Sequence, residues 1–165
     1  MADLLTHVLV PYVLLTAASW RVDRLTRRWV VIGMAGAAIP DLVKIEVLVD
    51  ERVLESLLGV PFSYAPVSSL GGVLLVAGAI AVFFGRERRQ VYALLVFGGL
   101  TALLVDGLRV FADGRSGFWL YPLWWRPPTP SLYISSDARV LVLALLASAG
   151  VFLYDRYVVA PSGDG

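Results

Sequence analysis

Long apolar runs separated by short polar segments are the main pattern of this chain. The runs predict five hydrophobic helices, at residues 4–20, 29–42, 67–84, 91–111 and 138–159. Stretches of about 20 apolar residues can cross the hydrocarbon core of a bilayer. Residues 44–58 instead mix charged and apolar positions, which predicts an amphipathic helix lying on the membrane. The expected fold class is all-α, a polytopic membrane helix bundle of about five transmembrane helices plus one interfacial helix.

The composition also indicates a membrane protein. Of the 165 residues, 58% are hydrophobic and 16% are charged, and the mean hydropathy is +0.76. Soluble domains are about 45–50% apolar and about 25% charged. The length suits one domain. We therefore expect a single transmembrane helical domain at residues 1–160 and a disordered tail at residues 161–165.

Net charge and the rare residue types exclude several classes of function. A net charge of +1 offers no electrostatic basis for binding nucleic acid. Because the chain has no Cys, disulfides, thiolate metal sites and cysteine nucleophiles are excluded. Its single His excludes a three-His zinc site within one chain. Membrane lipid is the expected partner, and a second copy of the chain or another membrane protein is left open.

The distribution of Arg residues predicts how the chain is oriented. Residues 21–28 hold four Arg, and residues 85–90 hold three. Loops rich in Arg and Lys stay on the cytoplasmic side of a membrane. With five crossings, the N-terminus is then outside and the C-terminus is cytoplasmic. The expected location is the cell (plasma or inner) membrane, with several crossings.

Three ionisable residues and a serine are expected at a similar depth. In the predicted topology His7, Asp41, Ser68 and Asp106 all lie near the outer ends of their helices. A charge within a span costs roughly 2.5–3.5 kcal/mol on insertion scales, so Asp106 inside an apolar run needs a reason. Together they predict a shared polar site near the outer interface. Taken singly, His7 also suits a plain interfacial position, and Asp41 suits a turn.

Two cations follow the two carboxylates at helical spacing. Lys44 comes three positions after Asp41, and Arg109 comes three positions after Asp106. Residues three apart share a helix face, so each carboxylate has a local partner. Such pairing is how a membrane helix tolerates charge. The aromatic residues at 119–125 are expected to form an interfacial belt.

The order of five motifs along the chain matches that of a known family. His7 lies in the opening segment, a Pro-Asp pair ending at Asp41 closes the second predicted helix, and residues 63–69 open the third. Asp106 lies in the fourth, and residues 117–123 form a Gly-Phe-Trp-Leu-Tyr-Pro-Leu segment in the next loop. This order resembles the YdjM-like family of inner-membrane proteins, described as LexA-binding proteins and as metal-dependent hydrolases.

The resemblance covers roughly residues 3–127 and implies a divalent, zinc-like metal site, but the chain departs from the family there. Three positions at which the family carries His are Ser63, Ser68 and Ala102 in this chain. A fourth, after the Pro-Asp pair, is Lys44. The side chains that remain from the implied metal set are His7, Asp41 and Asp106.

We expect a divergent family member in which Lys44, beside Asp41, takes the charge-balancing role of the metal. Such a protein would lack efficient hydrolase activity and serve as a binding or structural membrane protein; no catalytic residue is assigned. One alternative is an active metal-dependent hydrolase on a lipid or membrane-proximal substrate, whose metal activates water. Another is a small transporter subunit with Asp106 and Arg109 lining its pathway. The candidate binding residues are Lys44, Ser63, Ser68 and Arg109.

Overall fold

The computed structural model describes residues 2–111, 114–134 and 137–159, and the regular elements in these ranges are all helices. The same ranges contain two isolated β-bridges, which join Arg109 to Tyr133 and Arg115 to Pro128. The predicted all-α class is therefore confirmed. The tail predicted at residues 161–165 lies outside the described residues.

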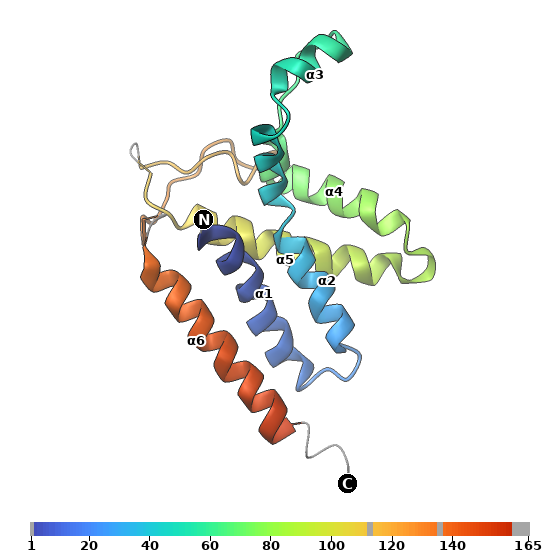
Figure 1. The fold of residues 1–165 in the computed structure, drawn as a ribbon, viewed down its shortest axis with the longest axis vertical. Coiled ribbons are helices and arrows are strands. Elements are labelled where there is room, and N and C mark those ends of the chain that lie inside the picture. The colour runs from blue at the N-terminus through green and yellow to red at the C-terminus, as the bar shows by residue number, and fades with distance from the viewer. Residues whose placement is uncertain (1, 112–113, 135–136, 160–165) are drawn as a thin grey trace.

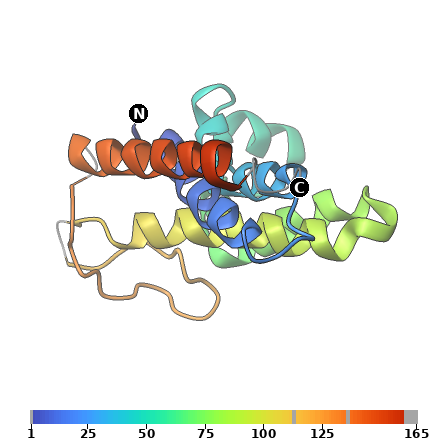
Figure 2. The ribbon, with the colours of Figure 1, turned by 90° about the horizontal axis from the view of Figure 1, so that it is seen from below.

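Five helices build the bundle: α1 (Ala2–Ser19), α2 (Arg27–Ala37), α4 (Leu70–Val82), α5 (Arg88–Gly107) and α6 (Ala138–Tyr154). Helix α1 is central, because it packs against α2, α5 and α6. Helix α4 packs against α5, with which it forms a hairpin (Figure 1). Figure 2 shows α5 and α6 on opposite sides of α1. The buried core consequently lies among α1, α2, α4 and α5.

Helices α2 and α5 make a tight contact through glycines. A Cβ atom added at Gly36 would clash with the backbone of Leu95. A Cβ atom added at Gly98 would clash with the carbonyl oxygen of Gly33. Small residues let membrane helices bring their backbones together. The glycines of α2 and α5 thus allow a close approach of the two backbones.

The second helix ends earlier than predicted, at Ala37 instead of residue 42. Pro40 has no backbone N–H with which to continue the helical hydrogen bonds. The chain instead continues as a 3₁₀ helix, η1 (Pro40–Val47). In this segment Asp41 lies in the first turn and Lys44 in the last.

The prediction of a single amphipathic helix at residues 44–58 is wrong. Its first part belongs to η1, and a separate helix, α3 (Glu51–Leu58), follows. Asp50 separates them, because its extended backbone starts α3 and its carboxylate accepts a hydrogen bond from the Arg52 N–H at 2.8 Å. Helix α3 has no buried residues and projects from one end of the bundle (Figure 1).

Two other predicted boundaries also move. The third hydrophobic helix begins at Leu70, three residues late, because residues 65–68 form the 3₁₀ helix η2 (Ala65–Ser68) and the Ser69 hydroxyl caps α4. The fourth ends at Gly107 instead of residue 111. It is preceded by a 3₁₀ turn, η3 (Gly85–Glu87), and α6 continues as a π-helical turn, η4 (Asp155–Val159).

Among the described residues, two helical segments are long and apolar enough to cross a membrane, Gly85–Gly107 and Ala138–Val159. Leu4–Ser19 and Leu70–Val82 are apolar but shorter. Helix α6 buries Ser148 and exposes large apolar side chains on its other faces. The exposed residues include Val142, Leu143, Leu145, Leu146, Phe152 and Leu153.

Ion pairs bring three chain segments to the same end of the molecule. Arg28, in the first turn of α2, pairs with Glu87, between α4 and α5. Nη2 of Arg27 lies 3.4 Å from Oδ2 of Asp155, the residue directly after α6. The two Arg-rich segments and the C-terminal end of α6 therefore lie together.

Candidate functional site

The single histidine lies between two carboxylates. His7, in the second turn of α1, is 1% exposed. Its Nδ1 atom is 3.3 Å from Oδ2 of Asp41, and its Nε2 atom is 3.3 Å from Oδ1 of Asp106. These three residues belong to α1, η1 and the last turn of α5, so the fold brings together positions far apart in sequence.

Each carboxylate also has the local cation predicted from the spacing. Lys44 Nζ pairs with Oδ1 of Asp41, and Arg109 Nη1 donates to Oδ1 of Asp106 at 2.7 Å. The side chain of Lys44 is 54% exposed, whereas that of Asp41 is 13% exposed. The five groups form a continuous chain of interactions, which we call the charge chain. Its order is Lys44, Asp41, His7, Asp106 and Arg109.

The group between the carboxylates is therefore the His7 imidazole and not the Lys44 ammonium. Ionised carboxylates can only accept hydrogen bonds, and a neutral imidazole has only one N–H. Both ring nitrogens of His7 face carboxylate oxygens. An imidazolium donates to both, so this geometry favours the protonated ring. Positive and negative groups then alternate along the charge chain.

Asp41 stays ionised where the chain leaves α2. Burial alone would raise the pKa of this carboxyl, but hydrogen bonds from His7 and Lys44 outweigh burial and hold the pKa below its usual range. The carboxylate is thus negatively charged at neutral pH. Its charge is balanced from the buried side by His7 and from the exposed side by Lys44.

The charge chain does not fit the zinc-like site that the family resemblance implies. Catalytic zinc needs several donor atoms at about 2.0–2.2 Å from one central point. Here the imidazole itself occupies the space between the carboxylates, and its two nitrogens face different side chains. Within the described ranges, no group of three or more His, Cys, Asp or Glu is arranged to hold a metal ion.

Three positions at which the family resemblance implies His make other contacts. The Ser63 hydroxyl donates to Oε1 of Glu51 at 2.9 Å, which ties it to α3. The Ser68 hydroxyl donates to the Ala65 carbonyl at 3.0 Å, within η2. Ala102, in α5, is fully buried. The hydrogen bonds of the two serines thus run to their own surroundings and not to the charge chain.

The loop at residues 114–134 closes the end of α5 beside Asp106, which the sequence did not reveal. The Thr129 hydroxyl is within hydrogen-bond distance of the carbonyl oxygens of Gly107, at 3.1 Å, and Arg109, at 2.6 Å. The Tyr133 hydroxyl donates to the Val105 carbonyl at 2.7 Å. The loop therefore supplies hydrogen-bond donors to carbonyl groups at the helix end, where regular helical partners run out.

Trp119 of the same loop packs directly on the helix end. A Cβ atom at Gly107 would clash with the indole ring, whose N–H donates to the Ser116 hydroxyl at 2.8 Å. The Trp119 carbonyl also accepts a hydrogen bond from the Leu70 N–H at the start of α4. Trp119 is therefore a packing residue as well as part of the aromatic group. A glycine directly after Asp106 was the available signal, because glycine permits close approach.

No known family model, curated protein or solved structure matches the chain. The resemblance to the YdjM-like family stays a prediction from the order of its motifs.

Proposed function

We propose that the chain is a multi-pass protein of the cell membrane, in which α1, α2, α4, α5 and α6 cross the bilayer. The apolar surface of α6 and the length of α5 support this arrangement. The segments that carry the Arg clusters face the cytoplasm, together with the C-terminal end of α6. Helix α3 and the charge chain lie at the outer side.

Two of the proposed spans are short. Helices α2 and α4 have 11 and 13 residues, or about 16–20 Å of helix, against a hydrocarbon core of about 30 Å. A bilayer adapts to short helices by local thinning. The five-span arrangement therefore requires the bilayer to thin locally around α2 and α4.

For the function itself, we propose a divergent member of the YdjM-like family that acts as a binding or structural membrane protein, without a catalytic metal. The observation that carries this proposal is the position of His7, with both ring nitrogens facing carboxylates. A charge-assisted network occupies the place where the family resemblance implies a metal. It joins the start of α1, the segment after α2 and the end of α5.

The decisive experiment measures metal content and its effect on stability. We expect protein purified in detergent to hold substoichiometric zinc, by elemental mass spectrometry, because the charge chain is neutralised by its own side chains. The melting temperature should not change with a chelator, since no metal contributes to folding. His7→Ala provides the matched control for any metal that is found.

The opposite outcome favours a different function. Stoichiometric metal that disappears in His7→Ala, together with a melting temperature lowered by chelator, would overturn the proposal. The active metal-dependent hydrolase on a lipid or membrane-proximal substrate would then become the preferred function.

A further inference from the structure

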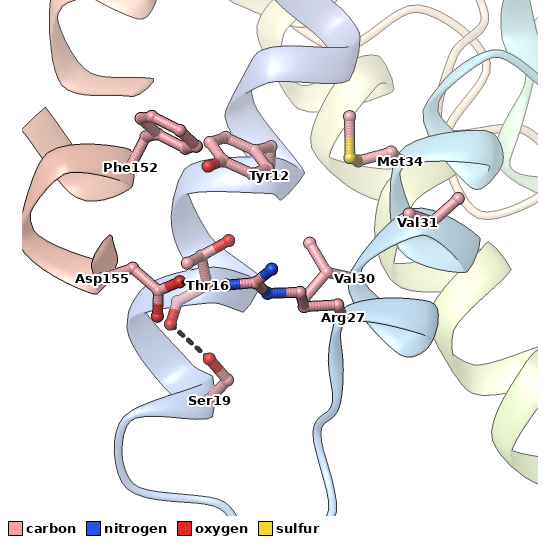
Figure 3. Close-up of a pocket in the computed structure, with 9 residues that line it drawn as sticks. All are labelled: Tyr12, Thr16, Ser19, Arg27, Val30, Val31, Met34, Phe152 and Asp155. Atoms are coloured by element: carbon pink, nitrogen blue, oxygen red, sulfur yellow. Dashed lines mark hydrogen bonds and ion pairs between the residues drawn. The ribbon is translucent and has the colours of Figure 1, made fainter. Parts of the chain in front are cut away.

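A cleft runs between α2 and α6, on the side of the molecule away from α4. Helix α1 forms its floor, and its volume is about 250 Å³ (Figure 3). Its walls are apolar along Val31 and Met34 on one side and Phe152 on the other. The polar lining residues gather toward the end where η4 begins, and they include Thr16, Ser19, Arg27 and Asp155.

The mouth of the cleft carries one cation and one anion side by side. Arg27 Nη2 is 3.4 Å from Oδ2 of Asp155, and the side chain of Arg27 is 88% exposed. The Trp20 indole N–H donates to the other oxygen of Asp155 at 3.3 Å, which orients the carboxylate. A single pair with so exposed a cation is weak, so both groups can exchange partners with a ligand.

An adjacent cation and anion complement a zwitterion. A guanidinium binds phosphate oxygens through charge-assisted hydrogen bonds. A carboxylate accepts hydrogen bonds from a primary ammonium group, which has N–H donors that a quaternary ammonium lacks. The other three Arg residues within residues 21–28 attract any anionic lipid, but they do not line the cleft.

We propose that this cleft binds one phosphatidylethanolamine molecule from the cytoplasmic leaflet. Its phosphate lies at Arg27, its ammonium at Asp155, and one acyl chain runs along Val31, Met34 and Phe152. This proposal rests on the membrane orientation proposed above and is independent of the role of the charge chain. The lipid class is selected by the pair at the mouth, and the apolar walls hold the chain.

The test is a lipid titration of the detergent-solubilised protein, followed by native mass spectrometry. Phosphatidylethanolamine, phosphatidylcholine and phosphatidylglycerol with identical acyl chains are compared. We expect about tenfold tighter binding of phosphatidylethanolamine than of phosphatidylcholine, equivalent to about 1.4 kcal/mol. Asp155→Asn should remove this preference while its amide oxygen still accepts from Trp20.

Further variants separate the headgroup from the acyl chain. Arg27→Gln should weaken binding of all three lipids, whereas Arg24→Gln, in the preceding loop and outside the cleft, should not. Val31→Trp should fill the cleft and abolish specific binding of every lipid. The matched control is Leu146→Trp, because Leu146 is similarly exposed at 64% but does not line the cleft.

Three outcomes would overturn the proposal: equal binding of the ethanolamine and choline lipids, a preference for phosphatidylglycerol that survives in Asp155→Asn, or unchanged binding in Val31→Trp. The failure of the membrane orientation is distinguishable from these. A chain recovered in the soluble fraction without detergent would contradict the membrane placement, whereas a detergent-dependent chain without lipid preference would contradict the cleft proposal alone.

Discussion

His7 illustrates how one residue acquires its significance from its surroundings. As a lone histidine near the start of an apolar helix, it also suited a plain interfacial position. In the structure it is buried, and it connects two carboxylates from distant segments. Its two interactions are therefore the central links of the charge chain.

His7→Ala should destabilise the fold by about 3 kcal/mol. Hydrogen bonds to charged groups contribute about 1.5–3 kcal/mol each, and two are lost, although each carboxylate keeps its local cation. The free energy of unfolding in mixed detergent micelles measures the effect. His7→Gln, which retains one N–H donor group, should lie between the wild type and His7→Ala. An unchanged stability of His7→Ala would contradict the central role of this side chain.

Lys44→Ala should have a much smaller effect. The Lys44 side chain is 54% exposed, and exposed pairs contribute about 0–1 kcal/mol. An ammonium buried between the two carboxylates would contribute more to stability, but His7 and not Lys44 occupies that place. The same unfolding assay decides the matter: a loss equal to that of His7→Ala would show that Lys44 balances both carboxylates.

Among the helices, the α2–α5 pair depends most on backbone proximity. Gly36 and Gly98 leave no room for a side chain at the crossing. The short length of α2 and the early stop before Pro40 also place Asp41 outside the helix, where it can turn toward α1. Packing at the glycine crossing and the geometry of the charge chain are therefore connected through α2.

Gly36→Ala should destabilise the protein by about 2 kcal/mol, as overpacking of a tight contact does. Gly150→Ala is the matched control, because nothing lies within 4 Å of a Cβ atom at that position of α6. Alanine there should be neutral or stabilising by about 0.5–1 kcal/mol, since glycine weakens a helix interior. Thermal unfolding of the two variants compares them directly, and equal melting temperatures would contradict the close crossing.

At the scale of the whole molecule, the ion pairs place both Arg-rich loops at one end, and α3 lies toward the other. The protein has no natural Cys, so single cysteines report the side of the membrane. We expect Thr26→Cys and Glu87→Cys to resist an impermeant thiol reagent added to intact cells. Ser56→Cys, in exposed α3, should react with it.

The reverse labelling pattern would place the Arg clusters outside and invert the proposed orientation. Labelling at only one of the two Arg-rich loops would contradict their shared location. Treatment of opened membranes, in which all three cysteines should react, is the control for accessibility.

The sequence by itself determined the features that depend on neighbouring residues. Apolar runs predicted the helices, and three-residue spacing predicted the pairs of Asp41 with Lys44 and of Asp106 with Arg109. Spacing along one turn sets which side chains meet. The resemblance to the YdjM-like family stays a prediction, and so does any metal-binding role of His7.

Only the tertiary structure decided what lies between the paired groups and what covers the end of α5. The place of His7 between the carboxylates, the closure of α5 by Thr129 and Trp119, and the cleft between α2 and α6 all depend on contacts between distant segments. The end of α5 at Gly107 is likewise covered by a loop from further along the chain. Hydrophobic periodicity carries no information about which distant side chains satisfy a helix end or a buried charge, because packing determines both.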